Sequence, residues 1–123
     1  MEIIKKKAAS GSGGTETTVS TTDATLTTID TVAIPTDKAV LTRAELVAIK
    51  DDQTEKAGFL IEAIYANNSG TVTLQGSVSY IHRQMPTGWD VTFVISGTDV
   101  LIRVAGNAAT NIDWKCSRTT LSV

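Results

Sequence analysis

The stretch TVTLQGSVSYI, residues 71–81, decides the fold class of this chain because apolar and polar side chains alternate along it. Successive side chains of a β-strand point to opposite faces, so one face of this stretch is apolar while the other carries hydroxyl and amide groups. The apolar face comprises Val72, Leu74, Val78 and Tyr80, with Gly76 among them. The stretch therefore predicts a half-buried strand with one wet face.

The same alternation predicts six further strands, at residues 25–34, 41–50, 59–66, 89–96, 100–104 and 112–123. Turn-forming residues separate several of them, such as Asn-Asn-Ser-Gly at 67–70 and Ser-Gly-Thr-Asp at 96–99, where glycine suits the positive φ of a tight hairpin. Short strands with regular turn signals between them are typical of a sandwich or a small barrel. We predict an all-β fold, an antiparallel β-sandwich of jelly-roll or immunoglobulin-like type with about seven to eight strands.

Residues 41–49 leave one alternative open, because Arg43-Ala-Glu-Leu contains good helix formers. The β-branched residues of this region favour a strand instead. They are Val40, Thr42, Val47 and Ile49. We therefore expect a strand here.

The first 23 residues differ in composition from the rest of the chain. Gly11, Gly13 and Gly14 lie among serines and threonines, so this segment has little to bury and should be flexible alone in water. We divide the chain into an N-terminal arm, residues 1–23, and a β-sandwich domain, residues 24–123. The arm is expected to dock on a neighbouring subunit. Its partner-binding candidates are Ile3, Ile4, Lys5, Lys6 and Lys7, although lysines near a terminus can also simply be solvated.

Composition narrows the class of protein. Among the 123 residues, 41% are hydrophobic and 20% are charged, which is typical of a folded globular domain. A net charge of −2 gives no positive field for nucleic acid, and no stretch approaches the length of a membrane helix. The N-terminus does not resemble a signal peptide, and a single cysteine excludes an intrachain disulfide, so folding in a reducing cytoplasm is compatible with the sequence. Nucleic acid and membrane are therefore not expected as partners.

Side chains suited to catalysis are few. The only histidine, His82, lies near no recognisable nucleophile motif, so we expect a surface or interface role. The only cysteine, Cys116, continues the apolar alternation of Ile112 and Trp114, which predicts a buried and inert thiol. We predict no catalytic residues and a protein that is not an enzyme.

Ligand motifs are equally weak. Asp51, Asp52 and Glu55 could hold a calcium ion, but their spacing fits no EF-hand loop and favours a solvated hairpin. The glycines at 11–14 lack the following Lys-Ser/Thr pair of a phosphate-binding loop. Trp89 and Trp114 could support a sugar, but their alternation favours core packing. No cofactor or metal site is predicted.

The domain resembles a small β module found in virion structural proteins of tailed phages and prophages. The resemblance rests on DATLTTIDTVAIP at 23–35, GTVTLQG at 70–76, WDVTFVISG at 89–97, VAG at 104–106 and IDWK at 112–115. These segments are spread over about the last hundred residues, and they are repetitive β patterns rather than catalytic signatures. The resemblance implies a trimer-forming β-sandwich of the virion, used as capsid decoration, as cement or as a tail-fibre domain.

Two functions follow as hypotheses. The first is a non-enzymatic capsid decoration or cement protein, which forms a homo-oligomer, expected to be a trimer, and docks through its arm on the major capsid protein or other virion subunits. It is favoured because the chain has one domain, an arm and no room for a fibre stalk. The alternative is a tail-fibre or receptor module that binds a host glycan through Trp89, Tyr80, Tyr65 and the acidic loop at 51–55. A hydrolase is not expected.

Overall fold

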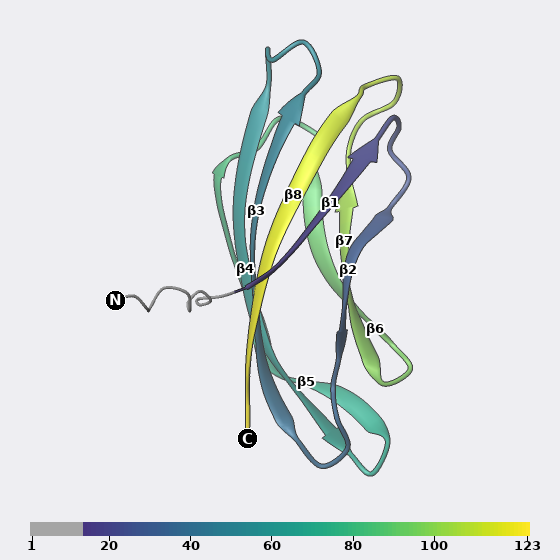
Figure 1. The fold of residues 1–123 in the computed structure, drawn as a ribbon, viewed down its shortest axis with the longest axis vertical. Helices are drawn as coiled ribbons and strands as arrows, with labels where there is room; N and C mark the ends of the chain where they lie inside the picture. The colour runs from purple at the N-terminus through teal and green to yellow at the C-terminus, as the bar shows by residue number, and fades with distance from the viewer. Residues whose placement is uncertain (1–13) are drawn as a thin grey trace, which may run out of the picture.

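Eight strands in two sheets make up the fold of this computed structural model, which describes residues 14–123 (Figure 1). Within that range the structure contains no helix, and so none that is long and apolar enough to cross a membrane. In chain order the strands are β1 (Thr15–Thr21), β2 (Thr27–Ala33), β3 (Ala39–Lys50), β4 (Lys56–Asn68), β5 (Thr71–Gln84), β6 (Asp90–Ser96), β7 (Asp99–Ala105) and β8 (Ile112–Ser122).

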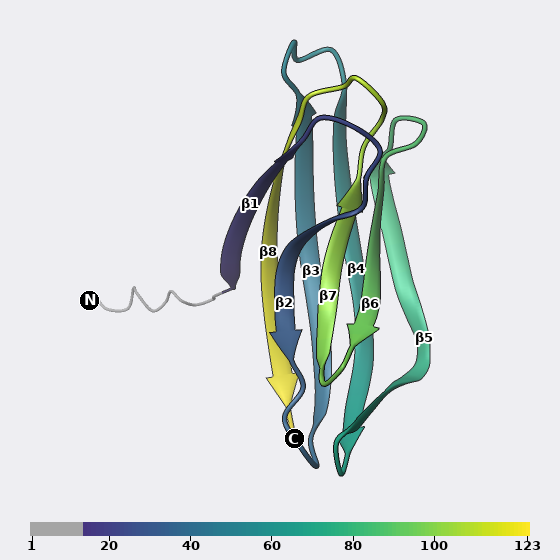
Figure 2. The same cartoon turned by 90° about the vertical axis from the view of Figure 1, so that its right-hand side faces the viewer.

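The two sheets are antiparallel and lie face to face. The five-stranded sheet has the order β1-β8-β3-β4-β5, and the three-stranded sheet has the order β2-β7-β6. Figure 2 shows the smaller sheet in front of the larger one, with β5 extending past β6 at one side. The prediction of an all-β antiparallel sandwich of seven to eight strands is confirmed, as is a strand rather than a helix at residues 41–49.

Hairpins join the neighbouring strands where turn residues predicted them. Gly70 has a φ of 99° between β4 and β5, and Gly97 has a φ of 62° between β6 and β7. These positive φ values carry little steric cost in glycine, which has no Cβ atom. The pairings β4 with β5 and β6 with β7 follow from these turns.

The core lies between the sheets and is built from the predicted apolar alternations. Val100, Ile102 and Val104 of β7 are fully buried. Trp89 and Trp114 are each 1% exposed, and their ring centroids lie 5.8 Å apart. The Trp114 indole N–H donates a hydrogen bond of 3.0 Å to the buried Thr21 hydroxyl. Both tryptophans therefore serve core packing.

A charged pair links the two sheets near β1. The Arg118 guanidinium of β8 donates to the Asp30 carboxylate of β2 at 3.0 Å through Nε and at 3.5 Å through Nη2. The Asp30 side chain is only 9% exposed. A carboxylate this buried needs such a partner, because its desolvation is otherwise costly.

The structure differs from the sequence prediction at β1. Residues 15–21, which we assigned to a flexible arm, form a strand paired with β8. The pairing is close at Gly14, where an added Cβ atom would lie 2.8 Å from the Arg118 carbonyl oxygen. Serine and threonine dominate this strand, so its order comes from backbone pairing and from Val19 and Thr21 at the core. Residues 1–13 lie outside the described range.

β5 also departs from expectation. Its predicted apolar face is buried only at Val72, whereas Leu74 and Val78 are 38% and 37% exposed. The reason is that β5 extends past β6 at the side of the sandwich, so little of the smaller sheet covers it (Figure 2). The side chains of β5 alternate between its two faces as predicted, but the smaller sheet covers little of this strand.

Candidate functional site

The outer face of the five-stranded sheet, turned away from the smaller sheet, carries many apolar side chains. Along β3, alternate residues from Val40 to Ala48 fill the core, so the residues between them point outward. These outward residues are Leu41, Arg43, Glu45, Val47 and Ile49. Three of the five are aliphatic. Alternation of apolar and polar residues predicts a polar, solvent-exposed outer face, and this face is more apolar than that.

Three exposed aliphatic residues lie side by side at the end of this face near the C-terminus. Leu41 pairs with Ile64 of β4 on one side and with Leu121 of β8 on the other. Their exposed fractions are 37%, 43% and 69% respectively. We call these three residues the apolar row.

A charged row follows two residues further along the same strands. Arg43 of β3 is the cross-strand partner of Glu62 of β4, and their side chains form an ion pair of 3.6 Å. Thr119 of β8 flanks Arg43, and Ser79 of β5 flanks Glu62. Opposite charges thus lie at the middle of the sheet beside the apolar row.

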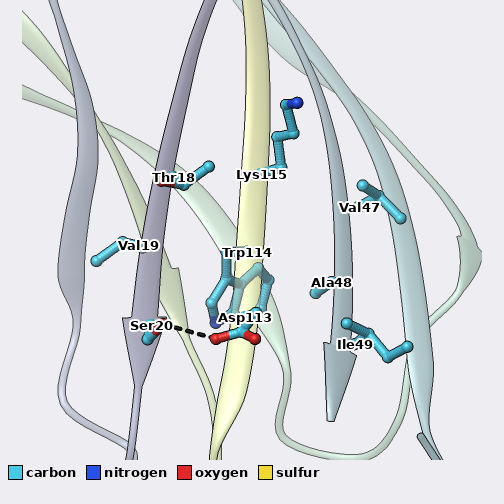
Figure 3. A pocket seen from close by; sticks show the side chains of 9 residues that line it. All are labelled: Thr18, Val19, Ser20, Val47, Ala48, Ile49, Asp113, Trp114 and Lys115. Carbon is cyan, nitrogen blue, oxygen red and sulfur yellow. Dashed lines mark hydrogen bonds between the residues drawn. The ribbon is translucent and has the colours of Figure 1, made fainter. Parts of the chain in front are cut away.

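A groove crosses β8 towards the other end of the outer face, between β1 and β3 (Figure 3). Its volume is about 380 Å³. Its outward side chains are Thr18, Ser20, Val47, Ile49, Asp113 and Lys115, and we call it the β8 groove. The residues come from three strands that are distant in sequence and adjacent in the sheet.

Hydrogen bonds hold the polar groups of the β8 groove in place. The Ser20 hydroxyl donates to the Asp113 carboxylate at 2.6 Å, as the dashed line in Figure 3 shows. The Lys115 ammonium contacts the Glu16 carboxylate at 3.1 Å. Both pairs link β1 to β8, so the polar wall of the groove depends on the strand that sequence reasoning missed.

The β8 groove combines hydroxyl, carboxylate and ammonium groups with two aliphatic side chains. Hydroxyls donate and accept hydrogen bonds, carboxylates accept them and ammonium groups donate them. Val47, 58% exposed, supplies an apolar surface beside them. Such a surface suits a ligand with many hydroxyls and apolar C–H faces, and the open shape suits a chain that extends past the groove.

The aromatic residues proposed from sequence to bind a glycan are buried or half-buried. Trp89 and Tyr65 are 1% and 2% exposed, so they cannot form a sugar platform. This confirms the favoured prediction of core packing for Trp89, whereas the alternative hypothesis that these two residues contact a glycan is wrong. Tyr80 is half-buried, and its hydroxyl donates to Asp90 at 3.0 Å. Burial, followed by this hydrogen bond, raises the pKa of Tyr80. His82 is exposed on the edge strand β5, with its ring centroid 5.9 Å from that of Tyr80.

The acidic loop between β3 and β4 is an exposed turn. The Asp52 carboxylate accepts hydrogen bonds from the Thr54 hydroxyl at 2.6 Å and from its amide at 3.0 Å. These bonds lower the pKa of Asp52. Among residues 14–123, no three His, Cys, Asp or Glu side chains gather in a way that could hold a metal ion.

Cys116 is fully buried, which confirms the prediction of a core thiol. Burial, with a smaller contribution from the charge of Asp30, raises the pKa of Cys116 to about 12. A thiol that stays protonated at neutral pH is a poor nucleophile. The partner-binding candidates Ile3, Ile4, Lys5, Lys6 and Lys7 lie outside the described residues.

Comparison with known proteins gives no family. No family model matches the chain, and no curated protein matches it. Among solved structures it is similar to gp49, a tailspike protein of Acinetobacter baumannii bacteriophage Fri1, at 10% identity and a TM-score of 0.39, over 88% of this chain and 19% of that one. It is also similar to the tailspike protein of Acinetobacter baumannii phage AM24, at 9% identity and a TM-score of 0.39, over 88% of this chain and 26% of that one. The chain thus spans about a fifth to a quarter of their lengths, and the likeness concerns the fold alone.

One of these neighbours bears on the prediction of a protein that is not an enzyme. The Fri1 tailspike is a capsular polysaccharide depolymerase, which contradicts the prediction that the chain is not an enzyme, and we withdraw that prediction. It rested on missing local motifs, whereas the paired carboxylates of glycoside hydrolases can come from distant parts of a sequence. Both neighbours are phage tailspike proteins, and the likeness of fold does not place this chain on a tail or on a capsid.

Proposed function

We propose that this chain is a tail-associated module of a bacteriophage that contacts bacterial surface carbohydrate through the β8 groove. The observation that carries the proposal is the groove itself, in which Asp113, Ser20 and Lys115 are held beside Val47 and Ile49. The resemblance of the sequence to phage virion modules supports the setting in a phage particle. We further propose that its position within the particle is the tail.

Polysaccharide suits the groove for two physical reasons. Sugar hydroxyls can replace water at the Asp113 carboxylate and the Lys115 ammonium without leaving these charges unpaired, because Ser20 and Glu16 keep their contacts with them. The C–H face of a sugar ring can lie on the aliphatic side chains and remove their surface from water. An open groove also lets a long polymer enter from either side.

Attachment of the module to the particle belongs to the same proposal. The N-terminal segment, including Ile3, Ile4 and the three lysines, precedes β1 and is the proposed contact with other virion subunits. Assembly into a trimer stays a prediction from the resemblance.

The experiment is an array of bacterial surface polysaccharide fragments, followed by calorimetric titration of any fragment that binds. Replacing Asp113→Asn removes one negative charge from the groove and should weaken binding by about tenfold or more, because hydrogen bonds to charged groups contribute about 1.5–3 kcal/mol. The melting temperature should stay unchanged, since Asp113 is exposed.

Asp52→Asn is the matched control, because it makes the same chemical change in the acidic loop that belonged to the alternative glycan-binding hypothesis. An asparagine can keep the turn at Thr54 through its carbonyl oxygen. We expect binding by D52N to equal that of the native protein. An array without any binding fragment, or equal losses in D113N and D52N, would contradict the proposal.

A further inference from the structure

The apolar row is not used by the proposed carbohydrate site and needs its own explanation. Leu41, Ile64 and Leu121 lie at the opposite end of the outer face from the β8 groove. Val123, 88% exposed, and Ala39 extend this surface, since each of these two residues donates its amide to the carbonyl of the other. Aliphatic side chains on both faces of central strands are typical of sheets that are covered on both faces.

The charged row identifies what could cover this face. Arg43 and Glu62 are direct cross-strand partners on the neighbouring strands β3 and β4. Consider a second copy stacked on this face and related to the first by a two-fold axis that runs parallel to the strands, between β3 and β4. β3 of one copy then lies over β4 of the other. Each arginine then faces the glutamate of the other copy, and like charges do not meet.

We propose that the outer face of the five-stranded sheet joins two copies of this chain about such an axis. In the same arrangement Leu41 of one copy faces Ile64 of the other, because they too are cross-strand partners on β3 and β4. Four charges of alternating sign lie beside four aliphatic side chains. A contact of this kind is isologous, since the same surface serves both copies.

The available area is sufficient for a specific contact. Strands lie about 4.8 Å apart and rise about 3.3 Å per residue, so the outward face of β8, β3, β4 and β5 over nine positions measures about 600 Å². Two copies would bury about 1,200 Å² in total, at the lower end of the range for stable interfaces. The same area includes Val47, Ile49, Asp113 and Lys115 of the β8 groove, so this contact and a carbohydrate in the groove would compete for these residues.

Sedimentation velocity over a range of protein concentrations tests the proposal with a matched pair of variants. Ile64→Lys places an ammonium group in the proposed contact and should convert the dimer to a monomer. Ile95→Lys makes the same change at β6 of the smaller sheet, where the exposed fraction is 41% against 43% at Ile64. The I95K variant should remain a dimer.

A mixing experiment tests the two-fold geometry itself. Arg43→Glu alone brings only negative charges together across the axis, and Glu62→Arg alone brings only positive ones, so each variant should be monomeric at low salt. An equimolar mixture restores opposite charges at both contacts and should sediment as a dimer. The double variant R43E/E62R should also dimerise.

Three results would overturn the proposal. They are a native protein that stays monomeric at all concentrations, an oligomer of any size that I64K leaves intact, and a mixture of R43E and E62R that does not associate. Circular dichroism spectra of each variant, compared with the native protein, show whether a loss of association reflects unfolding.

Discussion

The inner and outer faces of the five-stranded sheet are built from the same strands but show different side-chain chemistry. On β4, Ile61 is 2% exposed and lies in the core, whereas Ile64 is 43% exposed on the opposite face. A bulge between Glu62 and Ile64 in the pairing with β5 does not change the faces on which these isoleucines lie. The inner face therefore sets stability, whereas the outer face is free to make contacts.

The largest difference between the faces should appear in an isoleucine pair. Ile61→Ala leaves a cavity between the sheets and should lower the free energy of unfolding by about 3–4 kcal/mol. Ile64→Ala, on the outer face of the same strand, should lower it by less than about 1 kcal/mol at concentrations where the protein is monomeric. Urea unfolding of the two variants measures both values, and equal losses would erase the distinction between the faces.

A smaller effect is expected at the edge of the inner face, where charge replaces apolar packing. Arg118→Ala removes the partner of the Asp30 carboxylate, and we expect a loss of about 2–3 kcal/mol in urea unfolding at pH 7. Removing both groups in D30L/R118M should restore part of that loss, because no buried charge is left unpaired. If the double variant is less stable than R118A, the loss in R118A does not come mainly from leaving the Asp30 charge unpaired.

The burial of Cys116 on the inner face can be tested through the pH dependence of the free energy of unfolding. Its folded pKa of about 12 lies above the ordinary value of 9.0, so the folded protein holds the proton where the unfolded chain releases it. Stability that is complete below about pH 9 should therefore fall as pH rises, by about 1 kcal/mol between pH 8 and pH 10. Cys116→Ala should lose less over that interval, and an identical pH dependence in both proteins would show that the thiol is not held protonated by burial.

The smallest effect is expected at β5, where the inner face is only partly covered. Tyr80→Phe removes the hydrogen bond to Asp90 near the open side of the sandwich, and water can replace it there. We expect a loss of less than about 1 kcal/mol in thermal unfolding. A loss as large as that of I61A would mean that the side at β5 is as tightly closed as the centre.

Local patterns predicted most of the fold. Alternation located seven of the eight strands, and the glycines at 70 and 97 located two hairpins, because both signals involve residues close together in sequence. β1 was missed because Thr15–Thr21 has one apolar residue, Val19, and obtains its order from pairing with β8 about a hundred residues away. The exposure of Leu74 and Val78 depends on which strand lies opposite, which no local pattern specifies.

The candidate site was harder to predict than the fold. The β8 groove brings together residues near positions 20, 48 and 114, and their adjacency follows from the strand order β1-β8-β3. Sequence reasoning instead chose aromatic residues, and Trp89 and Tyr65 belong to the core. Outward Leu41, Val47 and Ile49 in an otherwise alternating strand were a signal that could have indicated a contact face.

The most direct measurement is a nuclear magnetic resonance titration of the ¹⁵N-labelled protein with bacterial surface polysaccharide fragments at low protein concentration. If the outer face is the contact surface, amide shifts should concentrate on β1, β8 and the end of β3 that contains Val47 and Ile49, and the smaller sheet should remain unchanged. Shifts confined to β2, β7 and β6, or to the acidic loop at 51–55, would contradict that assignment.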